Sequence, residues 1–288
     1  MSEEPKVIEL NIAYHPSPYP QAMRNDLIEM AEVCDGLYVI TTEADVQYCP
    51  RKITHCIDIA HELNLVTVLV MPGYGNLFET LGSSSVFTAV HPQLNCITNT
   101  GRAIPKSCPN KPEVGAFLSN TVQGLSSTFE ADGFLWNMPS WALPSHLGAL
   151  APEEWLCHCP DCVASFESQY QMPMPNTLTP EVEEFRTQTI TDCLTTVCQQ
   201  VKACGNHLIT SVRLGAHEQR LLSAAQNESL DVLGVDICWR PSDELCQKDL
   251  IEQSLKNVVR ISHQRGMLSE AWLCTWGMHT LHEGDIYR

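Results

Sequence analysis

The sequence predicts a parallel α/β fold, a TIM-type (β/α) barrel in which seven β/α units are visible and the eighth is missing or truncated. Two observations predict this fold. Short β-branched runs alternate with longer amphipathic runs along the chain, and each short run is nearly all apolar, as expected for strands covered on both faces. The length of 288 residues also suits such a barrel, which usually has roughly 250 residues. We therefore predict a single barrel domain over residues 1–288.

Seven apolar runs are the predicted strands, and they lie at 7–14, 36–42, 65–71, 133–137, 208–214, 232–239 and 267–273. Between them, apolar residues recur at helical spacing, as Met23, Leu27 and Met30 do. Such a stripe indicates a helix that packs on the sheet. These residues are therefore assigned to the core.

The end of the chain leaves the eighth unit open. Only fifteen residues follow the last predicted strand, too few for a helix and a closing strand. We favour truncation of a longer protein; closure with seven strands, or another segment in the eighth position, are the alternatives. Two long loops, at 75–112 and 139–180, follow the third and fourth strands, on the face where barrels of this kind have their sites.

Composition narrows the class of partner. A formal net charge of −17 argues against nucleic acid, whose phosphates require a basic surface, and against an anionic membrane. No apolar run reaches the roughly 18 residues that a membrane span needs. The first residues are acidic and polar and show no secretory signal, so we expect a cytoplasmic protein whose fourteen cysteines are reduced thiols and metal ligands. A homo-oligomer is left open.

The most specific motif is a cysteine cluster, in which Cys157, Cys159 and Cys162 have C-x-C-x-x-C spacing. Three thiolates at this spacing can surround one soft ion while the chain turns into a helix at 163–170, and tetrahedral zinc then needs a fourth ligand. Cys108 is the best candidate and His158 is the alternative. Because four sulfurs leave no open position for water, we predict a structural zinc site that joins the two long loops. Buried thiols without metal are the remaining interpretation.

Four segments together indicate a family. The segments CPNKP at 108–112, GFLWN at 133–137, CHCPDC at 157–162 and LDVLGVD at 230–236 resemble glycoside hydrolase family 42 β-galactosidases and related barrels, over about residues 105–275. The resemblance implies a barrel that hydrolyses glycosidic bonds in carbohydrates and four zinc thiolates beside the active site. It also implies a nucleophile on the seventh strand, where this chain has Glu270.

One departure from the family concerns its catalytic acid. The family has Asn-Glu at the end of the fourth strand, and this chain has Asn137-Met138. A thioether cannot donate a proton to a leaving group. Either hydrolysis uses another acid, or the barrel binds carbohydrate without cleaving it; a different reaction on the same fold is a third interpretation.

Two carboxylates are the predicted catalytic residues. Glycoside hydrolysis needs two carboxyl groups, about 5 Å apart for retention or roughly 6.5–9.5 Å apart for inversion. Glu270 and Asp236 interrupt apolar strands, where a carboxylate is costly unless it is used or paired. An ion pair with Arg213 or Arg240 is the alternative role for Glu270.

A set of polar and aromatic residues at or just past strand ends is predicted to contact a small carbohydrate. An indole face packs well on the apolar face of a pyranose ring, although burial in the core explains a tryptophan equally well. Polar side chains would bond ligand hydroxyls, and the acidic ones could instead be solvated loop charges. The set is His15, Glu43, Trp136, Asn137, Trp141, Arg213, Trp239 and Trp272.

Overall fold

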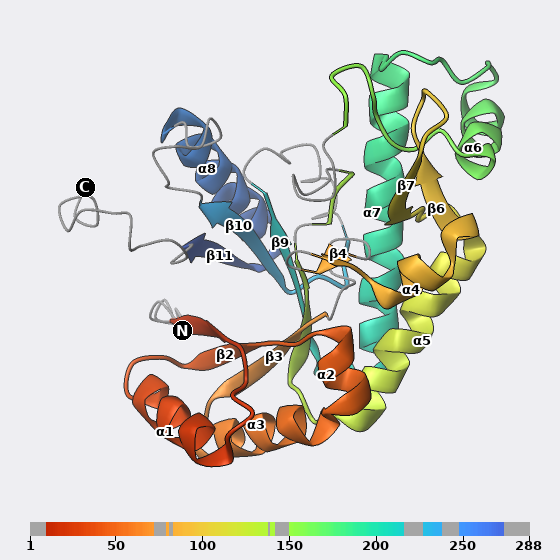
Figure 1. The fold of residues 1–288 in the computed structure, drawn as a ribbon. Coiled ribbons are helices and arrows are strands. Elements are labelled where there is room, and N and C mark those ends of the chain that lie inside the picture. The colour runs from red at the N-terminus through yellow and green to blue at the C-terminus, as the bar shows by residue number, and fades with distance from the viewer. Residues whose placement is uncertain are drawn as a thin grey trace.

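A computed structural model describes residues 10–71, 79–80, 83–137, 139–141, 150–215, 227–237 and 248–273 (Figure 1). Its centre is a seven-stranded sheet in which neighbouring strands are parallel and follow chain order. The strands are β1 (Asn11–Tyr14), β2 (Gly36–Ile40), β3 (Val66–Val70), β8 (Gly133–Asn137), β9 (Ile209–Leu214), β10 (Val232–Ile237) and β11 (Leu268–Leu273).

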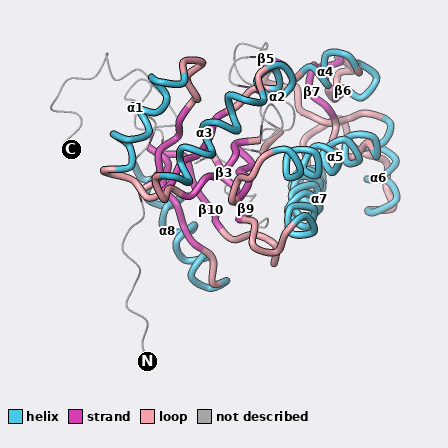
Figure 2. Tube along the Cα trace, turned by 90° about the horizontal axis from the view of Figure 1, so that it is seen from below, coloured by secondary structure: helices cyan, strands magenta, loops and turns pink. Residues whose placement is uncertain are grey.

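Helices cover the outside of this sheet, and Figure 2 shows α1, α3, α5 and α7 outside the strands. The helices are α1 (Pro20–Ala31), α2 (Glu43–Tyr48), α3 (Pro50–Glu62), α4 (Val86–Val90), α5 (Pro112–Thr128), α6 (Pro160–Tyr170), α7 (Pro180–Cys204) and α8 (Lys248–Arg265). Five of them, α1, α3, α5, α6 and α7, have proline at their start. Proline fits there because the first turn of a helix leaves its N–H groups without helical partners. Among the described helices, none is long and apolar enough to cross a membrane.

Shorter elements lie in the long loop after β3. They are β4 (Glu79–Thr80), β5 (Ser83–Ser84), a 3-10 turn (Pro92–Leu94), β6 (Asn95–Ile97) and β7 (Ala103–Ser107), with β6 and β7 paired as an antiparallel hairpin. The second long loop packs against this hairpin, because Thr98 forms a β-bridge with Leu156 and the His158 N–H donates to the Ile97 carbonyl at 2.7 Å. The two long loops predicted from the sequence therefore meet.

The sheet is curled, and its two faces have different surroundings. Phe134 and Trp136 belong to the large core between sheet and helices. Leu135, between them, belongs to a smaller cluster with Tyr38 and Trp272. The rings of Tyr38 in β2 and Trp272 in β11 lie 4.5 Å apart between centroids. Since these are the second and seventh strands of the sheet, their contact requires a concave face.

The two ends of the sheet approach each other through side chains. Asn11 Nδ2 in β1 donates to Glu270 Oε1 in β11 at 3.2 Å, and among the described residues β1 and β11 have no backbone pairing. The parallel α/β architecture thus agrees with the sequence prediction, as a curled half-barrel. The count of seven β/α units is not tested, because residues 216–226, between β9 and β10, lie outside the described residues.

Boundaries differ from the sequence predictions by a few residues. The second strand ends at Ile40 and not at residue 42, and the helix predicted over 163–170 begins at Pro160. The earlier helix start has a consequence for the cysteine cluster, because it places Cys162 in the first turn of α6.

Aspartates tie the strands together at the N-terminal end of the sheet. Asp35, Asp132 and Asp231 directly precede β2, β8 and β10. Each carboxylate accepts a hydrogen bond from a backbone N–H at the start of the neighbouring strand, at 3.1, 2.7 and 2.7 Å respectively. These contacts stabilise the base of the sheet, opposite the end where parallel α/β folds have their sites.

Candidate functional site

The carboxylate of Glu270 lies on the concave face and accepts hydrogen bonds from three side chains. Its Oε1 accepts from the Tyr38 hydroxyl at 2.6 Å and from Asn11 Nδ2 at 3.2 Å. Its Oε2 accepts from Trp272 Nε1 at 3.1 Å. Burial, together with the charge and hydrogen bond of Glu270, raises the pKa of Tyr38 far above its ordinary value, so the tyrosine stays a donor. The carboxylate is therefore held in one orientation.

An ion pair lies beside this carboxylate. Arg213 in β9 donates to Asp236 in β10 at 2.5 Å, and both side chains are largely buried, with exposed fractions of 17% and 18%. The guanidinium carbon of Arg213 lies 4.6 Å from the centre of the Trp272 ring. The ion-pair role that was the alternative for Glu270 thus falls to Asp236 where Arg213 is concerned; Arg240 lies outside the described residues.

Strand register gathers the concave-face residues into one row. Asn137, Arg213, Gly234 and Glu270 are successive partners across β8, β9, β10 and β11. Partners in register point to the same face of a sheet. A side chain at Gly234 would meet Trp272, whose Nε1 lies 3.0 Å from the ideal Cβ position. Glycine therefore leaves room in this row for the indole that contacts both Glu270 and Arg213.

Two buried polar atoms in this row are available to a ligand. Asn137 Oδ1 and Arg213 Nε have no hydrogen-bond partner within the described part of the chain. Buried polar groups are normally paired, and leaving one unpaired costs free energy. One atom is an acceptor and the other is a donor, so a ligand that offers hydroxyl groups could satisfy both.

The predicted tryptophans fall into different places. Trp272 lies on the concave face, whereas Trp136 is 1% exposed and packs in the core between sheet and helices. Trp141 is also buried in that core, and its Nε1 donates to the Arg186 carbonyl at 2.8 Å. The positions of Trp136 and Trp141 do not favour the ligand contacts predicted for them. Trp239 lies outside the described residues.

The remaining predicted ligand-binding residues lie near the ends of β1 and β2. His15 is exposed, and its Nε2 is 3.8 Å from Asp45 Oδ2. Glu43 is the first residue of α2, and its carboxylate accepts from the Val86 N–H at 2.5 Å. Glu43 therefore holds the loop after β3 against α2. Met138, which replaces the acid of the resembled family, lies outside the described residues.

The four predicted metal ligands come together in a buried cluster. The sulfur atoms of Cys108, Cys157, Cys159 and Cys162 all lie within 4.8 Å of one another. Cys108 Sγ is 3.4 Å from Cys162 Sγ and 3.7 Å from Cys159 Sγ. A tetrahedral zinc with bonds of about 2.3 Å needs sulfurs about 3.8 Å apart. The group could therefore hold a metal ion, with Cys108 and not His158 as its fourth member.

The surroundings of the cluster favour negative charge. Cys159 is the N-cap residue of α6 and Cys162 lies in its first turn, where the helix dipole stabilises an anion. Asn110 Nδ2 donates to Cys162 Sγ at 3.3 Å. Lys111 Nζ lies 2.6 Å from Asp161, so this ion pair also links the two segments that carry the sulfurs.

The sulfurs compete for protons in the absence of a cation. Hydrogen bonds, first of all from Cys108, lower the pKa of Cys157 and that of Cys159. Donation to neighbouring sulfurs raises the pKa of Cys162 and of Cys108 itself. Some thiols thus keep their protons because others ionise. A bound metal ion would remove this conflict, since it stabilises all four thiolates together.

Three residues of these sites escaped the sequence analysis. Cys96 in β6 forms side-chain hydrogen bonds with Cys108 and Cys157, but it has no informative spacing from them. Tyr38 was indistinguishable from a core aromatic residue in an apolar strand. Asn11 gave a signal that could have been used, because a polar residue interrupts the first predicted strand.

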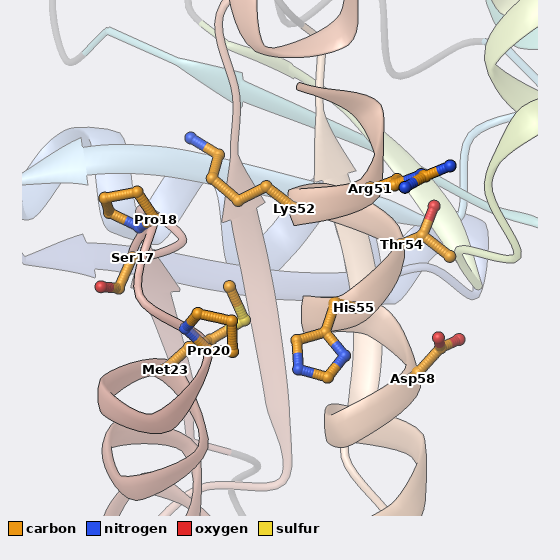
Figure 3. A pocket seen from close by; sticks show the side chains of 9 residues that line it. All are labelled: Ser17, Pro18, Pro20, Met23, Arg51, Lys52, Thr54, His55 and Asp58. Carbon is orange, nitrogen blue, oxygen red and sulfur yellow. The ribbon is translucent and has the colours of Figure 1, made fainter. Parts of the chain in front are cut away.

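A separate surface pocket of about 570 Å³ lies between α1 and α3. Figure 3 shows Met23 of α1 and His55 of α3 on its opposite sides. Lys52, which also lines it, is already paired with Asp45 at 2.5 Å. None of the concave-face residues lines this pocket, so we do not assign the site to it.

Comparisons with known proteins give the fold. No protein-family model matches the sequence, and no curated protein matches it. The β-galactosidase from Bacillus circulans sp. alkalophilus is similar in structure, with a TM-score of 0.63 and 13% identity over 88% of this chain and 43% of that chain. A polyextremophilic β-galactosidase from the Antarctic haloarchaeon Halorubrum lacusprofundi gives a TM-score of 0.62 and 11% identity over 85% and 43%.

A third similar structure has almost the same extent as this chain. It is the PgaB (BpsB) glycoside hydrolase domain from Bordetella bronchiseptica, with a TM-score of 0.55 and 10% identity over 98% of both chains. The chain spans under half the length of the two β-galactosidases. These likenesses show that the chain has the barrel-type fold of glycoside hydrolases; membership of family 42 stays a prediction.

Proposed function

We propose that this chain is a glycoside hydrolase-like barrel that binds a carbohydrate on the concave face of its sheet and hydrolyses a glycosidic bond. The observation that carries the proposal is Glu270, a carboxylate that three donors orient inside a fold shared with glycoside hydrolases. Glu270 would serve as the nucleophile or as the base that activates water. We also propose that residues 1–288 form a single barrel domain.

The other concave-face residues would bind the sugar. Asn137 and Arg213 each offer a buried polar atom to ligand hydroxyls, and Trp272 offers an indole to the ring. Asp236 already has Arg213 as its ion-pair partner, so we assign it to orienting Arg213 and to accepting a hydroxyl. The proton donor for the leaving group is not assigned to a residue.

We further propose that zinc binds the four cysteines as a structural ion. All four are buried thiols, and sulfur ligands in a closed tetrahedral set suit zinc. The ion would fix the segment after β7 to the start of α6 and would take no part in the reaction. The described cysteines are free thiols, which agrees with the reducing cytoplasm expected from the composition.

Activity on a broad panel of aryl glycosides and oligosaccharides tests the main proposal. We expect hydrolysis by the wild type, loss of at least about 1000-fold in kcat/KM in Glu270→Gln, equivalent to about 4 kcal/mol of transition-state stabilisation, and unchanged activity in Glu167→Gln. Glu167 is an exposed glutamate of α6 and serves as the matched control. Equal activity in all three proteins would contradict the role of Glu270.

A carbohydrate-binding barrel without catalysis is the second candidate, and Asn137-Met138 in place of Asn-Glu favours it. In that case no glycoside is cleaved, and calorimetry shows that Glu270→Gln binds the same oligosaccharide nearly as well as the wild type does. Measurable turnover by the wild type would exclude this candidate.

A further inference from the structure

A fifth cysteine lies against the proposed metal centre. Cys96 in β6 has no exposed surface. The backbone around it is tied to both ligand-bearing segments: the Cys108 N–H donates to the Leu94 carbonyl at 2.9 Å, and the His158 N–H donates to the Ile97 carbonyl at 2.7 Å. Cys96 is therefore held between the segment after β7 and the segment before α6.

The side chain of Cys96 contacts two of the four clustered sulfurs. It accepts a hydrogen bond from Cys108 and donates one to Cys157. It is not one of the four cysteines whose sulfurs lie mutually within 4.8 Å. The thiol therefore lies beside the edge of the sulfur tetrahedron that Cys108 and Cys157 form, outside the tetrahedron itself.

The chemistry of this position differs from that of an ordinary core cysteine. Burial raises the pKa of Cys96, so the group is a neutral S–H donor next to sulfurs that metal binding would ionise. Groups that donate to metal ligands tune both the ligands and the affinity for the ion. Cys56 is equally buried, but it lies in the core against α3, outside the sulfur cluster.

We propose that Cys96 is the fifth thiol of the metal centre. With four cysteines bound, it donates its S–H to the Cys157 thiolate. When Cys157 is absent, Cys96 loses its proton to solvent and forms the fourth metal–sulfur bond. This inference rests on the proposed metal centre and concerns only how that centre is completed.

Cadmium binding tests both parts of the inference, because Cd²⁺ occupies thiolate sites and reports the number of sulfur ligands through its charge-transfer absorbance and ¹¹³Cd resonance. The proteins are the wild type, Cys96→Ala, Cys157→Ser, the double variant, and Cys56→Ala as the matched control. Each is freed of metal under reducing conditions and loaded with Cd²⁺. Affinity is then measured by competition with a chelator.

We expect Cys96→Ala to keep four sulfur ligands but to bind Cd²⁺ about 10–100-fold more weakly, while Cys56→Ala matches the wild type. Cys157→Ser should still show four sulfurs, and the double variant should show three. Three sulfurs in Cys157→Ser alone, or equal affinities in Cys96→Ala and Cys56→Ala, would overturn the inference. If Cys157→Ser does not fold, the affinity of Cys96→Ala decides.

The same measurements separate this inference from the metal proposal. Wild-type protein that takes up less than half a cadmium ion per chain would overturn both. Wild-type protein that binds one ion while Cys96→Ala behaves like Cys56→Ala would overturn the role of Cys96 and leave the four-cysteine centre in place.

Discussion

The hydrogen bond from Tyr38 to Glu270 gives a direct test of the concave-face site. Tyr38→Phe keeps the ring that contacts Trp272 and removes only the hydroxyl, which lies 2.6 Å from Glu270 Oε1. Tyr38 is 4% exposed, so bulk water has little access to the carboxylate oxygen that loses its donor. A hydrogen bond to a charged group contributes about 1.5–3 kcal/mol. We expect the free energy of unfolding to fall by about that amount.

Urea denaturation, followed by tryptophan fluorescence and circular dichroism at neutral pH, measures the change. Tyr170→Phe is the matched control, because the Tyr170 hydroxyl also donates to a glutamate, Glu184, at 3.3 Å, but on the surface. There we expect a loss below about 0.5 kcal/mol. Similar small losses in both variants would refute the argument that Glu270 is a desolvated carboxylate held by Tyr38.

Three further outcomes follow from the structure. Arg213→Gln leaves Asp236 without its ion-pair partner, so it should cost about 3–5 kcal/mol in urea denaturation, and Asp236→Asn in the same chain should restore part of the loss. Metal chelation should lower the midpoint of thermal unfolding and speed proteolysis between 150 and 180, since zinc-coupled folding energy is lost; an unchanged cleavage pattern would count against the metal centre. Hydrogen bonds, led by that from Arg102, lower the pKa of Glu154 from 4.5 to about 2. Stability from this group is therefore complete above about pH 4.5 and is lost as the pH falls toward 2, and Glu154→Gln should flatten that part of a pH–stability curve.

The strands could be predicted from the sequence because both faces of the sheet are covered. A strand buried on both sides is a continuous apolar run, and seven such runs correspond to the seven parallel strands. The cysteine quartet was also predictable, since three of its members are adjacent in sequence and their spacing is rare. Strand ends were less predictable, because an apolar residue past the last backbone hydrogen bond looks the same in the sequence.

The surroundings of Glu270 could not be predicted in the same way. Asn11 and Tyr38 are 259 and 232 residues away from it along the chain, and only the curl of the sheet brings them together. The face of Trp136 was predictable in part. Side chains alternate along a strand, so Trp136 and Asn137 cannot both point to the concave face, although both were predicted to contact the ligand.

The carboxylate of Glu270 has two tasks, because it also joins the first strand of the sheet to the last. Among the described residues, the link from β1 to β11 runs through the Asn11 amide and the same oxygen, Oε1, that a bound molecule would approach. A molecule that recruits this oxygen competes with the fastening of the half-barrel. Ligand occupancy and the curvature of the sheet are therefore thermodynamically linked, and a substitution at Asn11, far from any reacting atom, should change how tightly a sugar is held.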